Sequence, residues 1–114
     1  MENTVEQKSF LFAVRIVKLY NHLRRTKREL ILSKQLLRSG TSIGANIAEA
    51  EQAQSRADFV AKHSIALKEA SETDFWLRLL KETNYLSNTE FHSIYEDCVE
   101  IKKMLVSIIK SSKQ

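Results

Sequence analysis

The sequence predicts an all-α protein folded as an antiparallel up-down-up-down four-helix bundle, and three observations lead to this fold class. The 114 residues include no proline and only two glycines, whereas an all-β fold needs turn residues at short intervals. Residue types that favour helices dominate the composition. Helix-capping patterns recur with short connections between them, so neighbouring helices are expected to run antiparallel.

The capping patterns predict helix starts near residues 4, 27, 56 and 88. In each pattern a cap residue precedes an acidic residue by three positions: Thr26 with Glu29, Ser87 with Glu90 and, more weakly, Ser55 with Asp58. Asn3 or Thr4 is placed to begin the first helix. We therefore expect one domain over residues 1–114, with helices at approximately 4–24, 27–52, 56–83 and 88–111.

Apolar periodicity supports the first and last of these helices. In the last, a bundle seam repeats at spacings of three and four: Phe91, Ile94, Cys98, Ile101, Leu105 and Ile108. The first helix has two adjacent seams: Phe12, Ile16, Leu19 and Leu23, then Phe10, Ala13, Val17 and Tyr20. Together the two seams span about 220° of the helix, more than one core requires. The excess predicts a subunit interface.

The stretch SGTSIGANIAEAEQ, residues 39–52, raises the question of a break between helices. Apolar residues stay in phase across Gly40 and Gly44, which favours one continuous helix that packs closely against another. Beside them runs a polar ridge, and the third helix offers two carboxylates to meet it. The predicted structural polar layer comprises Ser42, Asn46, Glu49, Glu69 and Glu72. We interpret it as a hydrogen-bond network, with a metal or small-molecule site as the alternative.

Patterns that would indicate an enzyme are missing from the sequence. Neither a Walker loop nor a dinucleotide fingerprint surrounds the glycines, and no histidine follows a glutamate at di-iron spacing. Cys98 lies on the apolar seam, where a small buried side chain is the better interpretation than a catalytic thiol. We expect no enzymatic activity, cofactor or metal. A single cysteine and no long apolar run predict a soluble cytoplasmic protein without a membrane partner.

Charge is distributed unevenly along the chain. Residues 1–48 contain nine Lys and Arg against three Glu, a balance of +6, whereas residues 49–100 contain five against eleven acids, a balance of −6. The candidate nucleic-acid-binding residues are Arg15, Lys18, Arg24, Arg25, Lys27, Arg28, Lys34 and Arg38. Such a surface suits phosphates. A solvated corner, or a scaffold whose basic half docks an acidic protein surface, explains the same charges.

The chain also resembles a known family. The segment SIGANIAE at 42–49 lies within QLLRSGTSIGANIAEA, and is followed by Asp58–Phe59, ALKEASE at 66–72, Tyr85–Leu86 and an apolar last helix. In this order the segments resemble the four-helix-bundle proteins encoded in intervening sequences of 23S ribosomal RNA genes, a family once labelled a ribosomal protein.

The resemblance implies a homopentamer of up-down-up-down bundles. It also implies a fold shared with the accessory proteins of diversity-generating retroelements, which bind reverse transcriptase and nucleic acid. With the charge pattern, it predicts a non-enzymatic oligomer that binds RNA or DNA, and a protein partner is also expected. The alternative is a scaffold without nucleic-acid binding.

Overall fold

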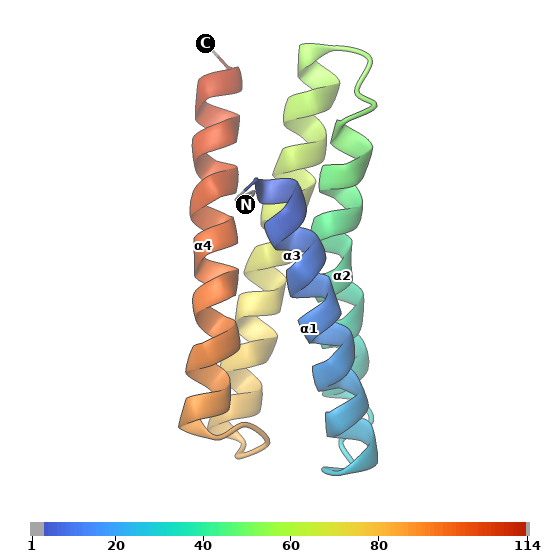
Figure 1. Cartoon of the computed structure of the whole chain (residues 1–114), viewed down its shortest axis with the longest axis vertical. Coiled ribbons are helices and arrows are strands. Elements are labelled where there is room, and N and C mark those ends of the chain that lie inside the picture. The colour runs from blue at the N-terminus through green and yellow to red at the C-terminus, as the bar shows by residue number, and fades with distance from the viewer. Residues whose placement is uncertain (1–3, 114) are drawn as a thin grey trace.

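A computed structural model of the chain describes residues 4–113, which fold into four helices and contain no strand (Figure 1). The helices are α1 (Val5–Arg25), α2 (Leu32–Ala50), α3 (Arg56–Glu82) and α4 (Asn88–Ser112). Two of the connecting loops lie at one end of the molecule and the third at the other end (Figure 1). The prediction of an all-α protein with four helices is confirmed.

Side-chain caps begin three of the helices where the sequence predicts them. The Oγ1 atom of Thr4 accepts a hydrogen bond from the N–H of Gln7 at 3.2 Å, which begins α1. Ser55 caps α3 in the same way through the N–H of Asp58. The predicted capping box at Ser87 forms in full: its hydroxyl accepts from the Glu90 N–H, and Glu90 Oε1 accepts from the Ser87 N–H. The other candidate for the first cap, Asn3, lies outside the described residues.

The predicted start of the second helix is wrong. The helix begins at Leu32, not at residue 27, and Thr26 is the C-terminal cap of α1 instead of an N-cap. Arg28 adopts a positive φ of 59°, a conformation that no helix continues through. Glu29 bonds forward to the N–H groups of the new helix, so the sequence pattern was correct about a cap but not about its direction.

The predicted continuity of α2 across the glycines is confirmed, because Leu32–Ala50 is one helix. The two glycines allow α1 to approach α2 closely. A Cβ atom at position 40 would lie 2.8 Å from Cγ1 of Ile16, and one at position 44 would lie 3.3 Å from the backbone oxygen of Ser9. Close helix packing therefore compensates the low helix propensity of glycine here.

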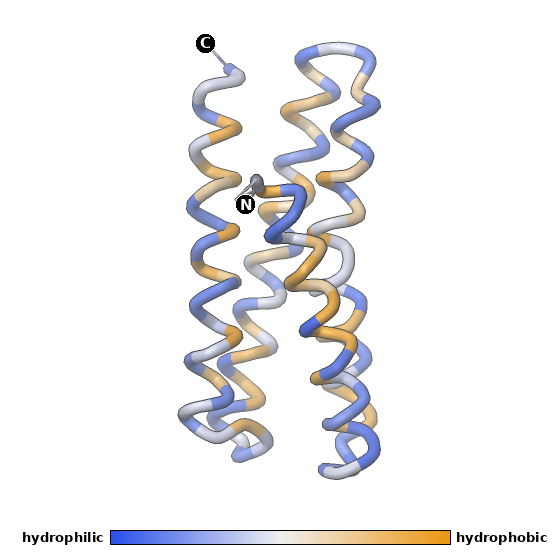
Figure 2. Tube along the Cα trace, viewed as in Figure 1, coloured by the Kyte–Doolittle hydropathy of each residue, from blue (hydrophilic) through white to orange (hydrophobic). Residues whose placement is uncertain are grey.

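A single apolar core joins the four helices, and the predicted seam of α4 is buried in it from Phe91 to Leu105, with Ile108 partly buried at its end. The first predicted seam of α1 is also in the core, whereas the second is largely on the surface. Phe10 is 68% exposed and its neighbour Leu11 is 62% exposed. Figure 2 shows these hydrophobic stretches along α1, alternating with hydrophilic ones. An uncovered apolar face remains on this helix.

Candidate nucleic-acid interface

Four cations gather at the end of the bundle where α1 stops. Arg24 and Arg25 lie in the last turn of α1, and Lys27 and Arg28 lie in the loop that follows. All four side chains are exposed. We call these four residues the basic end. The predicted bounds placed Lys27 and Arg28 at the start of the second helix, and the structure corrects that placement.

Local backbone bonds explain why the basic end faces outward. The N–H groups of Thr26 and Lys27 both donate to the carbonyl of His22, which closes α1. The N–H of Glu29 then donates to the carbonyl of Leu23 at 2.9 Å, and both residues are buried. With Leu23 and Glu29 fixed inside, the residues between them project into solvent.

One acid, Glu90, lies near the basic end, and its pKa is lowered chiefly by a hydrogen bond from the Ser87 backbone and also by the charge of Lys27. Among residues 4–113, no hydrogen bond or ion pair engages the side chains of Arg25, Lys27 or Arg28. The guanidinium of Arg24 lies 5.3 Å from the centre of the Tyr20 ring, a distance suited to a cation–π contact. Their charge is therefore available to an anion.

The other four candidates divide into two pairs. Lys18 and Lys34 are exposed and free of such contacts within the described residues. Arg15 instead donates to Asp97 at 2.6 Å and to Ser93, which ties α1 to α4. Arg38 donates to Glu72 at 2.6 Å and lies 3.4 Å from Glu69. These two ion pairs lie between helices, so Arg15 and Arg38 contribute less charge to an outside partner.

The five residues of the predicted polar layer do not form one layer. The hydroxyl of Ser42 donates to the Arg38 carbonyl, and the amide of Asn46 donates to the Ser42 carbonyl, so both bond within α2. Glu49 is exposed and pairs with Lys62 at 2.8 Å. Glu69 and Glu72 face Arg38 instead. Short polar side chains on a helix bond readily to their own preceding turn, which the helical wheel does not display.

The buried polar contact between α2 and α3 was missed by the sequence analysis. The hydroxyl of Thr73 donates to Ser39 Oγ at 2.9 Å, and both side chains are fully buried. Ser39 begins the stretch 39–52, but no pattern in the sequence pairs it with Thr73. One buried hydrogen bond with both partners satisfied favours this register of α2 against α3.

A second unpredicted cluster surrounds Asp74, which is 8% exposed. Burial opposes the charged carboxylate, but hydrogen bonds from Arg78, Lys102 and Tyr95 outweigh it, and together they lower the pKa of Asp74. Two of these partners lie on α4. The cluster joins α3 to α4, and its charges are balanced within the fold.

Cys98 is inert and His63 is occupied. Burial raises the pKa of the Cys98 thiol to about 12, so little thiolate, the nucleophilic form, exists at neutral pH. His63 is buried, with Nδ1 2.8 Å from the Phe59 carbonyl oxygen. Among residues 4–113, no group of three His, Cys, Asp or Glu side chains is arranged to hold a metal ion. In the same range, none of the helices has the length and hydropathy that crossing a bilayer requires.

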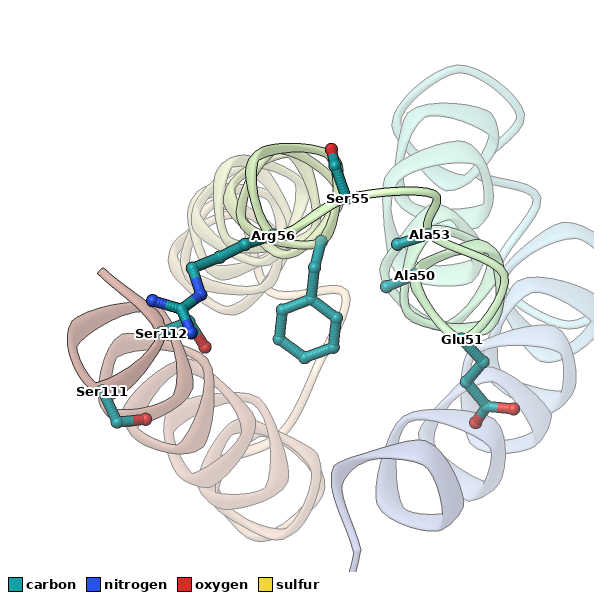
Figure 3. A pocket seen from close by; sticks show the side chains of 8 residues that line it. Ala50, Glu51, Ala53, Ser55, Arg56, Ser111 and Ser112 are labelled. Carbon is teal, nitrogen blue, oxygen red and sulfur yellow. The ribbon is translucent and has the colours of Figure 1, made fainter. Parts of the chain in front are cut away.

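A hollow of about 460 Å³ lies at the end of the bundle opposite the basic end, between the end of α2, the start of α3 and the end of α4 (Figure 3). The side chain of Arg56 extends there toward Ser112, and alanine and serine side chains line much of the rest (Figure 3). None of the predicted site residues lines this hollow. We regard the basic end as the better candidate interface.

These features define an all-α, four-helix protein with an exposed basic end and an uncovered apolar face. The chain belongs to the 23S rRNA-intervening sequence protein family, whose family model matches residues 1–107. It is similar to a protein of unknown function from the S23 ribosomal protein family of Bacteroides thetaiotaomicron VPI-5482. That crystal structure superposes with a TM-score of 0.93 at 60% identity, over 94% of this chain and 99% of the other. Comparison with curated proteins gives no match.

Proposed function

We propose that this protein is a non-enzymatic, oligomeric helical bundle that binds the phosphate backbone of RNA or DNA through its basic end. The observation that carries the proposal is the set of exposed cations at Arg24, Arg25, Lys27 and Arg28, none of which forms an ion pair with an acid among residues 4–113. Phosphates exchange their counterions for such side chains without regard to base sequence. Binding is therefore sequence-tolerant and weakens steeply with salt.

Reversal of the four charges tests this function. The variant R24E/R25E/K27E/R28E is expected to bind a labelled ribosomal RNA fragment at least about 100-fold more weakly than the parent at low salt, because four phosphate contacts become repulsive. Fluorescence anisotropy at low and high salt measures the affinity and its salt dependence.

The matched control reverses four exposed lysines elsewhere and reaches the same net charge: K68E/K103E/K110E/K113E. It is expected to lose much less affinity, since its changes lie away from the basic end. Equal losses in both variants indicate attraction by net charge alone. Absence of binding by the parent protein at low salt excludes the function and favours a scaffold.

The proposed assembly is a homopentamer of antiparallel up-down-up-down bundles. Family resemblance supports the pentamer, and the exposed Phe10 and Leu11 of α1 supply an apolar surface for subunit contact. In a ring, each basic end is repeated around the axis, which raises avidity without a new kind of contact. The basic end also fits the alternative function, a scaffold in which the basic half of one subunit docks an acidic partner.

Light scattering tests the assembly. The parent chain is expected at a mass five times the 13.2 kDa of one chain. Phe10→Glu is expected to yield smaller species, because a charge would be buried at the interface. Gln7→Glu, an exposed change on the same helix, is expected to leave the mass unchanged. A monomeric parent protein contradicts the proposed assembly.

A further inference from the structure

A groove of about 520 Å³ opens between α1 and α4, beside the basic end. Its apolar lining is formed by Leu19, Leu86 and Ile94, and its polar lining includes His22 from α1 and Thr89 from α4. The volume lies in the range of small-molecule sites in proteins. Six of the nine lining residues are polar or charged, and a flat ring with hydrogen-bonding groups on its edge suits such a mixed surface.

An ion pair between α1 and α4 lies at one end of the groove. Arg15 lies in its lining and donates to the Ser93 carbonyl at 3.1 Å, to Ser93 Oγ at 2.8 Å and to Asp97 at 2.6 Å. This ion pair fixes the distance between α1 and α4 at that level. Elsewhere these two helices pack more loosely than the consecutive pairs do. The opening is thus part of the fold.

One polar atom of a residue that lines the groove lacks a hydrogen-bonding partner. Nε2 of His22 is inaccessible to solvent and makes no hydrogen bond within residues 4–113. An unpaired buried nitrogen has lost its hydration without a replacement, which costs free energy. A rotation of the His22 ring that brings Nε2 to the groove surface would let a ligand with a complementary hydrogen-bonding group recover that loss. His22 therefore points to a ligand independently of the shape of the groove.

The charges around the groove decide how a nucleotide would lie. Lys18 in the lining is exposed, and Arg24 and Arg25 follow His22 on the same helix. These cations favour phosphates at the mouth of the groove, outside its interior. The acid in the lining is Glu90, whose pKa is lowered chiefly by its hydrogen bond from the Ser87 backbone. A negative charge there disfavours a phosphate inside and leaves the interior to the base.

We propose that this groove holds one unstacked nucleobase of a bound single strand, seated on Leu19 beside His22, while the neighbouring phosphates lie on Lys18 and the basic end. The inference rests on the proposed nucleic-acid binding and specifies its substrate class: single-stranded segments in preference to duplexes. A paired base is stacked within its helix and does not enter the groove, whereas an unpaired base does so at little cost.

The test compares a labelled single-stranded oligonucleotide with a perfect duplex of the same length, for three forms of the protein. The parent is expected to bind the single strand more tightly. Thr89→Trp fills the groove from an exposed position and is expected to lower single-strand affinity about tenfold, the effect of losing one base contact, without changing duplex affinity. Ser107→Trp, exposed on the same helix and outside the groove, is the matched control.

A second readout does not depend on a bulky substitution. A strand that carries 4-thiouridine is expected to crosslink to peptides from α1 and α4 that line the groove, and His22→Leu is expected to weaken single-strand binding while circular dichroism shows an intact fold. Equal affinity for both substrates, with no effect of Thr89→Trp, overturns the groove and leaves binding by the basic end standing. If neither substrate binds at low salt, both proposals fail.

Discussion

Replacing Glu29 with alanine is expected to lower the free energy of unfolding by about 2–4 kcal/mol. The Glu29 carboxylate accepts hydrogen bonds from three successive N–H groups at the start of α2, those of Ile31, Leu32 and Ser33, at 3.2, 3.0 and 2.6 Å. The first N–H groups of a helix have no partner within it, and Glu29 is only 8% exposed, so water replaces the carboxylate poorly. Its negative charge also interacts favourably with the positive, N-terminal end of the helix dipole.

The effect of Glu29→Ala is measured by urea and thermal unfolding followed by circular dichroism, at equal protein concentrations because assembly shifts apparent stability. Glu29→Gln retains one acceptor oxygen without the charge and is expected to be intermediate. Glu96→Ala removes an exposed glutamate from α4 and is expected to change stability by less than about 0.5 kcal/mol. Equal stabilities of Glu29→Ala and Glu96→Ala would show that the cap is not stabilising.

The elements that the sequence predicts well are those governed by local signals. The seam of α4 repeats without interruption, and its start is marked by a capping box whose two bonds both form. The N-caps at Thr4 and Ser55 likewise depend on residues three positions apart. In each case the stabilising contacts lie within one turn, so the pattern contains the information that determines the structure.

The start of α2 was not predictable from the same kind of signal. A glutamate three residues after Thr26 has capping-box spacing, yet here Glu29 bonds forward to the next helix. The turn that separates the helices depends on Arg28 at positive φ, a conformation usually marked by glycine or asparagine. Because arginine gives no such signal, the predicted helix began five residues too early.

The candidate site was predicted in part. The clustering of Arg24, Arg25, Lys27 and Arg28 follows from their closeness in the chain, and the structure keeps them exposed. The pairing of Arg15 with Asp97, 82 residues away, depends on which face of α1 meets α4. The groove and the unpaired nitrogen of His22 arise from the same packing. Periodicity within one helix does not determine how two helices are rotated about each other.

Gly40→Ala is expected to destabilise the protein by about 1–2 kcal/mol, although alanine is the better helix former by about 1 kcal/mol. The added methyl would lie 2.8, 2.9 and 3.0 Å from Cγ1, Cγ2 and Cδ1 of Ile16. Ile16 is fully buried in the core, so its side chain has little space into which to move. Overpacking therefore outweighs the gain in helix propensity.

Gly44→Ala is the matched comparison in the same helix. A methyl there would approach the Ser9 backbone oxygen at 3.3 Å and Ser9 Oγ at 3.4 Å, a much milder contact. We expect its net effect to stay within about 1 kcal/mol of zero, because the propensity gain offsets the contact. Urea unfolding of the two variants separates the steric effect from the helix propensity that they share.

A double-mutant cycle assigns the cost of Gly40→Ala to Ile16. Ile16→Ala removes all three atoms that the new methyl would meet, and alone it costs about 2–5 kcal/mol through the cavity it leaves. In the double variant the methyl enters that cavity. The free-energy cost of the double variant is therefore expected to be smaller, by at least about 1 kcal/mol, than the sum of the costs of the two single variants. Two outcomes would contradict this account: additive costs, or a Gly40→Ala variant as stable as its parent. Either would mean that α1 moves away from α2 freely and that the close approach at Gly40 does not constrain the bundle.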